Sequence, residues 1–571
     1  MRRKRMVAFM LCLAMLAGLL GACGKKEADP KKETGQTEDQ KDSDAGEEGD
    51  TGKADGEDQE DSQGDKAAAD DWSWPLETKE ELSMWIAWSN EYVLEPNELI
   101  SIQKIEENTN VHIKWVTVAS QEASEKFGLM MASGDYPDII RGLDGYYTGG
   151  LVQACDDGII YDMTDYIPTH MPLYHSLRES NEKLSRDTVT DDGRMIGVYT
   201  IASNYGEIGG ERVWDGLCVR QDWLDEQNME QPVTIDDWYT MLKMFKDVYQ
   251  CEAPLLIGAQ NGYDVMHSFL SAYGVLGEFY NDNDTVKYGP LEQGYRQWVE
   301  LFRQWYAEGL IDPNFTNNDA AFMGSGDYIG TGRAGASANI FGWTADSYKV
   351  YGYTDDEDFF LAGVTAPVLN VGDTPQAGFP TSELVKETVC ISKNCTKPEL
   401  ACRWIDYFYT EECMLLDSLG IEGDSYVVEN GEYRMSDAMF QKVEDGEFPN
   451  MASAVSTYTL GTSHFGLYNW GMMDTTTQGS MSRTTEAYDA WTKESFDLML
   501  PPCMTMTPEE TVQYNNKYTA IKTLVQENTI KFITGAQSMD AYDAFVEKLI
   551  EYGIEDCIQY QQAAYNRYMA R

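Results

Sequence analysis

Few residue patterns in this chain have the spacing that catalysis requires. The five histidines are scattered, and none of them belongs to the H-E-x-x-H pattern of a zinc protease. The string Gly461–Phe465, G-T-S-H-F, is the nearest to a serine-nucleophile elbow, and it lacks the second glycine. The paired carboxylates of a glycosidase have no distinctive spacing in so acidic a chain, so an enzyme acting on a polysaccharide stays open as an alternative.

Two strings resemble cofactor or metal loops, and each departs from its pattern at one necessary position. Gly330–Gly335 matches G-x-G-x-x-G, but Ala336–Phe341 has the pattern of a strand where a bound dinucleotide needs a helix. Asn281–Glu292 has the length of a calcium loop, but Val286 stands where such loops need glycine. We therefore expect no cofactor and no metal, and a solvated turn at 281–292 with calcium binding left open.

The cysteines of the folded part give no sign of a metal site or of a disulfide framework. None of them forms a C-x-x-C pair, and their number is odd, so at least one is unpaired. We expect mostly buried free thiols. The residues are Cys155, Cys218, Cys251, Cys390, Cys395, Cys402, Cys413, Cys503 and Cys557.

The chain is strongly acidic and rich in aromatic residues. It has 96 Asp and Glu against 43 Lys and Arg, and a formal net charge of −53. That charge disfavours nucleic acid, anionic lipid and other anionic ligands, because each would be repelled. Phe, Trp and Tyr make up 12% of the residues, and such rings stack on the apolar faces of uncharged sugars. The composition therefore favours a neutral, hydroxyl-rich ligand, although most of the rings are expected in the core.

The first 23 residues have the pattern of a bacterial lipoprotein signal. Arg2–Arg5 are positively charged, Met6–Leu20 is an apolar run of 15 residues, and Leu20–Cys23 resembles a lipobox. The resemblance implies cleavage before Cys23 and a lipid on its thiol, which would anchor the protein on the extracellular face of the cytoplasmic membrane. A plain secreted protein with a chance cysteine at this position is the alternative.

Residues 24–71 are expected to form a disordered acidic tether. They hold 18 acidic and 7 basic residues, with no aromatic residue and no aliphatic side chain larger than alanine. Such a segment cannot bury enough apolar surface to offset the entropy of ordering. We therefore divide this part of the chain into a signal peptide at 1–22 and a lipidated cysteine with its tether at 23–71, and the folded body begins near residue 72.

The start of the folded body alternates strand and helix patterns. Residues 82–88 are a continuous apolar run, and residues 111–118 alternate with a period of two, so both are predicted strands. Helical patterns at 96–108 and 124–132 follow them in turn, and a third short strand is expected at 139–140. The order β-α-β-α-β predicts an α/β sheet with helices on its faces.

Three later helices are marked by hydroxyl residues at their starts. Thr234, Thr396 and Thr507 each precede a helical apolar stripe and have an acidic residue three positions on, which predicts a cap at each start. The helix that starts at Thr396 is expected to end at Gly420.

Several strings in one order resemble the extracellular solute-binding proteins, family 1, of carbohydrate ABC transporters, especially the long lipoproteins of Gram-positive bacteria. Each string alone is weak, but their order along about 80–565 is specific. They are F-G-L-M-M-A-S-G-D-Y-P-D-I-I at 127–140, V-R-Q-D-W-L-D at 219–225, W-Y-A-E-G-L-I-D-P-N-F at 305–315, I-S-K-N-C-T-K-P-E at 391–399, G-I-E-G at 420–423, F-I-T-G at 532–535 and Y-N-R-Y at 565–568.

The resemblance implies an α/β, two-lobed periplasmic-binding-protein-like fold of type II, with a hinge and a cleft between the lobes. Lobe 1 would take residues 72–217 and about 384–450, and lobe 2 about 218–383 and 451–571. Ligand in the cleft would contact both lobes and favour the closed state.

The function implied is that of an extracytoplasmic lipoprotein that captures a neutral oligosaccharide and delivers it to the permease subunits of an ABC transporter, as a monomer and without chemistry on the ligand. A surface carbohydrate sensor or adhesion protein is the main alternative, and a peptide or another polar solute stays open. Aromatic residues would stack on the ligand, and Asn90 and Asp144 would bind its hydroxyl groups. The expected ligand-binding residues are Trp88, Asn90, Asp144, Tyr146, Tyr147, Tyr205, Trp214, Phe341, Trp343, Phe465, Tyr468 and Trp470.

Overall fold

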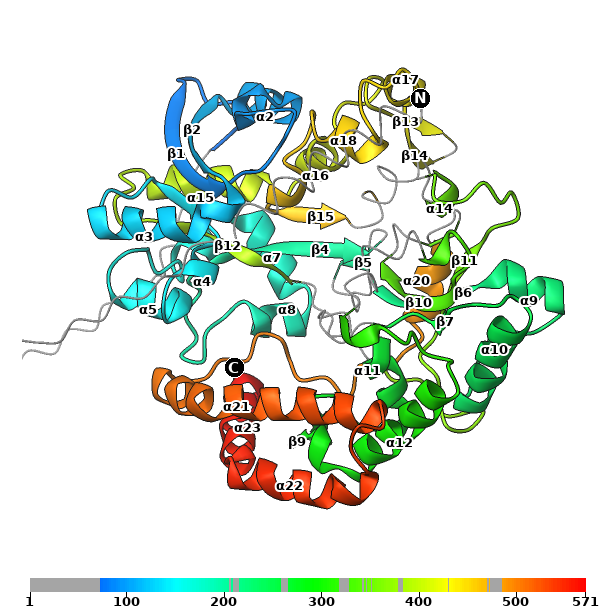
Figure 1. Ribbon diagram of the computed structural model, residues 1–571. Helices are drawn as coiled ribbons and strands as arrows, with labels where there is room; N and C mark the ends of the chain where they lie inside the picture. Colours follow the sequence, from blue (N-terminus) through cyan, green and yellow to red (C-terminus); the bar gives the residue numbers. More distant parts are fainter. Residues whose placement is uncertain are drawn as a thin grey trace, which may run out of the picture. The chain divides into compact units, whose positions relative to one another are not determined.

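The computed structural model (Figure 1) describes one compact unit, Trp72–Arg571. Within it, the described residues leave out 205–206, 209–214, 258–264, 318–327, 341–343, 346, 351, 378–383, 430, 470–471 and 473–484. The signal peptide, Cys23 and the tether lie outside the described residues. No helix in the described part of the chain is long and apolar enough to span a membrane.

The first sheet is built from segments that lie far apart in the sequence. Its strands run in the order β15-β4-β12-β3-β1-β2, and β5 pairs with β4. The strands predicted at 82–88 and 111–118 are confirmed as β1 and β2, which pair in parallel along their whole length. The bounds are β1 (Glu80–Ala87), β2 (Val111–Val118), β3 (Ile139–Arg141), β4 (Val198–Asn204), β5 (Glu207–Ile208), β12 (Leu384–Ile391) and β15 (Leu467–Asn469).

Both faces of this sheet are buried. In β1, Leu82, Met84 and Ile86 belong to one apolar core, whereas Trp85 belongs to another with Phe127, because alternate side chains of a strand point to opposite faces. The helices of this half are α2 (Ile100–Thr109), α3 (Ala123–Ser133), α4 (Leu143–Tyr146), α5 (Gly150–Asp156), α6 (Tyr166–His170), α7 (Pro172–Glu179), α8 (Glu182–Asp187), α15 (Pro398–Tyr407), α16 (Glu411–Ser418), α17 (Asp437–Glu444) and α18 (Met451–Val455). A two-stranded ribbon, β13 (Tyr426–Glu429) with β14 (Glu432–Met435), accompanies them.

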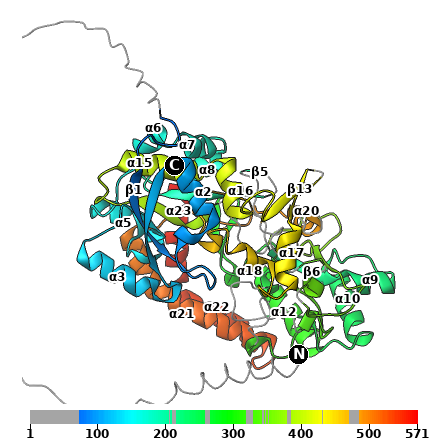
Figure 2. The ribbon, with the colours of Figure 1, turned by 90° about the horizontal axis from the view of Figure 1, so that it is seen from above.

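A second sheet has its own core. Its strands are ordered β11-β6-β10-β7, and their bounds are β6 (Asp215–Arg220), β7 (Ala253–Leu255), β10 (Ala334–Ile340) and β11 (Leu361–Val364). The helices of this half are α9 (Gln221–Gln227), α10 (Ile235–Asp247), α11 (Val265–Leu270), α12 (Gln293–Ala307), α14 (Ser347–Val350), α20 (Thr485–Trp491), α21 (Pro508–Ile533), α22 (Tyr542–Glu551) and α23 (Ile554–Met569). Both ribbon views place α9 and α10 on the opposite side of the molecule from α3 and α5 (Figures 1 and 2). We refer to the two halves as the first and second lobes.

Local capping chemistry explains two of the three predicted helix starts. Thr234 and Thr507 each form a full capping box, with Asp237 and Glu510 at the third helical position. The prediction at Thr396 is wrong: Lys397 is the N-cap residue of α15 and makes no side-chain cap bond.

The helix predicted to run from Thr396 to Gly420 is two helices. α15 ends at Tyr407, and the side chain of Thr410 accepts a hydrogen bond from the Cys413 N–H at the start of α16. Gly420 follows α16 with a φ of 90°, a left-handed conformation that suits glycine.

One part of the expected lobe division differs from the packing. Met451, Ala454 and Leu467 lie in the core of the first sheet, and β15 pairs in parallel with β4. Residues 451–469 and Met472 therefore pack with the first lobe, although we expected them in the second. The first lobe extends beyond residue 450 because a short apolar strand pairs with whichever sheet edge the fold leaves open, and that edge is β4.

The thiols match the expectation. All nine cysteines in the described part of the chain are free, and seven of them are buried. Burial raises the pKa of these thiols; for Cys390, for example, it rises to about 12. They therefore act as small apolar core residues rather than as nucleophiles.

Candidate functional site

The parallel strands of the first sheet end at a common edge. β1, β2, β3, β4 and β15 all run in the same direction, and only β12 and the short β5 run against them. We call the residues that follow these five strands the carboxyl edge of the first sheet. Ligands of open α/β sheets bind outside the carboxyl ends of the strands, so this edge is the candidate site.

The chain crosses between the two sheets at this same edge. It leaves β4 at Asn204 and enters β6 at Asp215, and it leaves β15 at Asn469 and reaches α20, which packs on β11. It returns at Leu384, the start of the antiparallel β12, which lies beside Ile201 of β4. Figure 1 shows β4 and β15 pointing toward the elements of the second sheet. Three crossings at one edge are the hinge of the two lobes.

The second sheet presents its own carboxyl ends to the crossings. Asp215, the first residue of β6, pairs with Ile340 at the end of β10, and Leu217 pairs with Val364 at the end of β11. β7 runs parallel to β10 and so ends on the same side. The two carboxyl edges therefore flank the three crossing segments, and a solute bound there would contact both lobes.

Two carboxyl groups, those of Glu494 and Asp215, lie at the carboxyl edge of the second sheet. Glu494 Oε1 accepts a hydrogen bond of 2.6 Å from the Ala366 N–H, just beyond β11. Burial, together with the negative charge of Asp215, raises the pKa of Glu494 to about 8. Glu494 is therefore protonated at neutral pH, which lowers the negative charge at this edge.

The three residues after β3 that were predicted to bind ligand make contacts within the first lobe. Asp144 Oδ1 accepts hydrogen bonds from the N–H and the hydroxyl of Thr388, at 2.9 and 2.8 Å, and so fastens α4 to β12. The Tyr147 hydroxyl donates to Asp157 at 2.6 Å, and this bond raises the pKa of Tyr147 to about 12. The ring of Tyr146 packs edge-on against Trp85, with centroids 5.7 Å apart.

Trp88 and Asn90, expected just after β1, shape the loop at the edge. Trp88 is only 7% exposed, and its indole N–H donates to the Val93 carbonyl at 3.1 Å. The Asn90 amide donates to the Ser456 carbonyl at 2.7 Å, while its oxygen accepts from the backbone N–H groups of Tyr92 and Val93. In this conformation the polar groups of Asn90 are used within the fold, so direct binding of ligand hydroxyls stays a prediction without support from the contacts.

Phe465, which we expected to stack on a ligand, lies in the core of the first lobe. Its ring is 0% exposed and stacks on Phe408 with centroids 4.2 Å apart, beside Trp404. The ring is a core residue because it precedes β15, whose pairing with β4 draws this segment into the first lobe. Tyr468, within β15, is 6% exposed and lies 4.7 Å, ring to ring, from His464.

Five of the expected residues lie outside the described residues but adjoin described strands. Tyr205 and Trp214 follow β4 and precede β6, Phe341 follows β10, and Trp470 follows β15; Trp343 is two residues beyond Phe341. Their closeness to these strand ends holds for the sequence alone, and their positions and roles stay predictions.

A buried polar network that the sequence did not reveal supports the same edge. Arg141 Nη2 at the end of β3 donates to the His464 carbonyl at 3.1 Å. The His464 ring contacts the Asp417 carboxylate and, at 3.1 Å, the Leu467 carbonyl, while Asp417 also accepts from the Leu460 N–H at 2.7 Å. This network fixes the segment that leads into β15. No sequence pattern marks it, because its members come from distant segments.

The possible calcium loop is a β-hairpin. β8 (Phe279–Asp282) and β9 (Thr285–Tyr288) are joined by Asn283 and Asp284, both with positive φ, which is the conformation of a tight two-residue turn. Asp282 pairs with Lys287 at 2.6 Å, and Asp284 accepts from the Tyr565 hydroxyl at 2.6 Å. Among the described residues there is no group of three or more His, Cys, Asp or Glu placed to hold a metal ion.

A cavity of about 330 Å³ lies at the other end of β1 and is separate from this site. It is lined by Trp72, Leu76, Glu77, Thr78, Glu80, Lys397 and Leu400. Glu80 begins β1, so the cavity is at the amino end of the strand.

Two sheets joined at their carboxyl edges by three crossings define a two-lobed solute-binding fold of type II. The chain belongs to the bacterial extracellular solute-binding protein family, whose sequence profile matches residues 101–413. Members of this family bind solutes rather than convert them, so the protein is not an enzyme.

Relatives and solved structures agree with this assignment. The chain is 23% identical over 521 residues to the fructooligosaccharide ABC transporter substrate-binding protein FusA of Streptococcus pneumoniae, covering 87% of this chain and 92% of that protein. It is 24% identical to the lipoprotein LipO of Bacillus subtilis over 58% of this chain and 65% of that protein. Among solved structures, an HMO-binding, ABC-transporter-associated solute-binding protein from Bifidobacterium longum infantis superposes with a TM-score of 0.69 at 16% identity, covering 86% of this chain and 99% of that one.

Proposed function

We propose that the protein is a lipid-anchored binding protein that captures a neutral oligosaccharide between its lobes and delivers it, as a monomer, to the permease of an ABC transporter. The observation that carries the proposal is the convergence of both carboxyl edges on three crossings, with Tyr205, Trp214, Phe341 and Trp470 directly next to the strand ends in the sequence. Relatives whose names include fructooligosaccharide and HMO binding support a carbohydrate.

The charge of the chain supports an uncharged ligand. A formal net charge of −53 repels anionic solutes at long range, whereas neutral hydroxyl groups are unaffected. The protonated carboxyl of Glu494 keeps a hydrogen-bond donor at the second lobe's edge without adding charge.

The first experiment screens the purified body by thermal shift against neutral fructo-, gluco- and manno-oligosaccharides and against oligouronates. Because binding to the folded state stabilises it, a neutral ligand at a hundred times its Kd would add about 2.7 kcal/mol. We expect a raised melting temperature with a neutral sugar, no effect of uronates, and unchanged sugar on chromatography. Cleavage products would contradict a pure binding role, and binding of uronates would contradict the charge argument.

Trp343→Ala and Trp470→Ala are expected to weaken sugar binding about ten- to hundredfold, since a buried aromatic ring is a typical hot spot, and to change stability little. Isothermal titration calorimetry measures the affinity, and thermal unfolding without sugar measures the stability. Trp72→Ala is the matched control, because Trp72 is 36% exposed and lies at the amino end of the first lobe. Unchanged affinity in both site variants would show that the site lies elsewhere.

Cys23→Ser is expected to release the full-length protein from membranes into the soluble fraction, because the thiol is the only proposed point of lipid attachment. Cell fractionation and blotting measure the distribution, and Cys12→Ser, within the signal peptide, is the control. Retention of the Cys23 variant on membranes would refute the anchor.

An assay of sugar uptake distinguishes delivery to a permease from a sensor or adhesion role. Deletion of the gene would abolish import of the bound sugar if the protein serves a transporter. Normal import in the deletion strain would favour the sensor role.

A further inference from the structure

The last turn of the C-terminal helix joins the second lobe to the first. α23 begins within the second core, where Ile554 and Cys557 are buried. The segment before α21 also touches both lobes, since Leu498 packs against the second core and Cys503 against the first. The C-terminal region thus makes a contact between the lobes that is separate from the three crossings.

The buried part of this contact is a tyrosine–aspartate pair. The Tyr568 hydroxyl of α23 donates to Asp187 Oδ1 of α8 at 2.6 Å, and both residues are at most 2% exposed. The guanidinium groups of Arg186 and Arg571 lie 5.6 and 5.1 Å from the centre of the Tyr568 ring.

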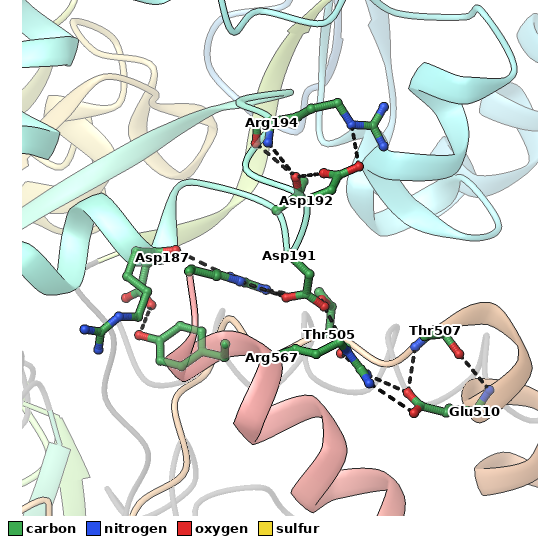
Figure 3. Close-up of polar contacts among 12 residues, drawn as sticks. Asp187, Asp191, Asp192, Arg194, Thr505, Thr507, Glu510 and Arg567 are labelled. Atoms are coloured by element: carbon green, nitrogen blue, oxygen red, sulfur yellow. Dashed lines mark hydrogen bonds and ion pairs between the residues drawn. The ribbon is translucent and has the colours of Figure 1, made fainter.

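Two arginines of α23 and its C-terminus hold a second aspartate of the first lobe. Arg567 Nε donates to Asp191 Oδ2 at 3.1 Å, and its Nη groups bind both oxygens of Glu510 in α21 (Figure 3). Arg571 Nε donates to Asp191 Oδ1 at 2.9 Å, and its side chain is 2% exposed. The Thr505 hydroxyl also donates to Asp191, at 3.1 Å. Asp191 therefore receives three donors from the C-terminal region.

Such a network is costly to open. Separating α23 from α8 would take the Tyr568 hydroxyl away from the buried Asp187 carboxylate, and it would take the nearly buried Arg571 side chain away from Asp191. A hinge between two lobes consists, in general, of a few chain segments that absorb rotation through their backbone angles. Opening of the lobes is therefore easier by rotation at the crossings than by separation of α23 from the first lobe.

We propose that the last turn of α23, with Asp187 and Asp191, is a fixed pivot: the contact persists while the lobes open and close, and it defines one end of the rotation axis. The proposal concerns the lobe motion on which the proposed function depends. It assigns to the C-terminus a mechanical role in that motion without any contact with the ligand.

Distance distributions between pairs of spin labels test the pivot in the ligand-free protein. One pair is placed at Glu182 and Ala570, on exposed positions beside the contact, and the other at Glu91 and Asp489, on exposed positions of the two lobes. Labels are introduced as unnatural amino acids, because the described part of the chain already holds nine free thiols. We expect a narrow distribution for the first pair and a broader one for the second. Equal widths for the two pairs would overturn the pivot.

Neighbouring aspartates supply a matched pair of variants. Asp191→Ala removes the carboxylate that α23 holds, whereas Asp192→Ala removes one that binds Arg194 of its own loop at 2.9 Å. We expect Asp191→Ala to broaden the Glu182–Ala570 distribution at least twofold and Asp192→Ala to leave it unchanged. Tyr568→Phe, which loses only the hydroxyl bond, serves if the alanine variant does not fold. No broadening in either pivot variant would overturn the proposal.

Addition of kestose separates this inference from the proposed function. If the protein binds that sugar, the Glu91–Asp489 distance shifts while the Glu182–Ala570 distance stays constant. If no sugar of the screen shifts the Glu91–Asp489 distance, the sugar-binding proposal fails. The widths of the two distance distributions measured without ligand still decide whether the contact is a pivot. A shift of both distances with sugar would overturn the pivot alone.

Discussion

Phe465→Ala is expected to lower the free energy of unfolding by about 3–5 kcal/mol and to leave sugar affinity within twofold. The ring is fully buried and stacks on Phe408 at 4.2 Å, so its removal leaves a cavity in the first core. Urea unfolding followed by circular dichroism measures the stability, and calorimetry below the unfolding transition measures the affinity.

Tyr552→Ala is the control for this result. Tyr552 is 46% exposed, and its replacement should change stability by at most about 0.5 kcal/mol. The opposite pattern for Phe465→Ala, a large loss of affinity with little loss of stability, would mean that the ring belongs to the ligand site after all.

The second large effect concerns pH and Glu494. Its pKa rises from the ordinary value of 4.5 to about 8 in the folded state, chiefly because burial disfavours the charged carboxylate. Between these two values the folded protein holds a proton that the unfolded chain has lost. The contribution of Glu494 to stability therefore falls as the pH rises from 4.5 to 8, in total by about 3–5 kcal/mol.

Glu494→Gln is expected to remove this dependence. Glutamine keeps the side-chain oxygen that accepts from the Ala366 N–H, and it cannot ionise. The variant should match the wild type near pH 5 and exceed its stability by about 3–5 kcal/mol at pH 8.5. The measurement is the difference in unfolding free energy between variant and wild type at several pH values, since that difference cancels the contributions of the other titrating groups. Glu486→Gln, on the exposed face of α20, is the control. A difference that does not vary with pH would contradict the raised pKa.

The parts of the fold that could be predicted are those with local physical causes. Strict alternation predicts β2, and a threonine with an acidic residue three positions on predicts the starts of α10 and α21. The same pattern fails at Thr396, because Lys397 takes the cap position there and Pro398 begins the helix. The packing of 451–469 with the first lobe was missed because a three-residue strand contains no information about its partner, which is 260 or more residues away in the chain.

In the candidate site, too, features with local causes could be predicted and features that depend on distant segments could not. Its general position could be predicted, since side chains after strand ends gather at one edge of a parallel sheet. The burial of each side chain could not be predicted, because Trp88 and Phe465 are covered by core residues that distant segments contribute. Glu494 was missed for the same reason: nothing in the sequence distinguishes it from the other acidic residues, and its raised pKa arises from burial beside Asp215.

The interleaved order of the strands has a consequence for cutting the chain. Because the strands of the second sheet lie in sequence between β4 and β12, and α20–α23 of the second lobe follow β15, no contiguous fragment consists of one complete lobe alone. A chain shortened to residue 383 would lose β12, an inner strand of the first sheet, and would not fold as half a protein. A single proteolytic nick in one crossing, by contrast, would leave the halves tied covalently through the remaining two, so nicked protein would still purify as one particle under native conditions.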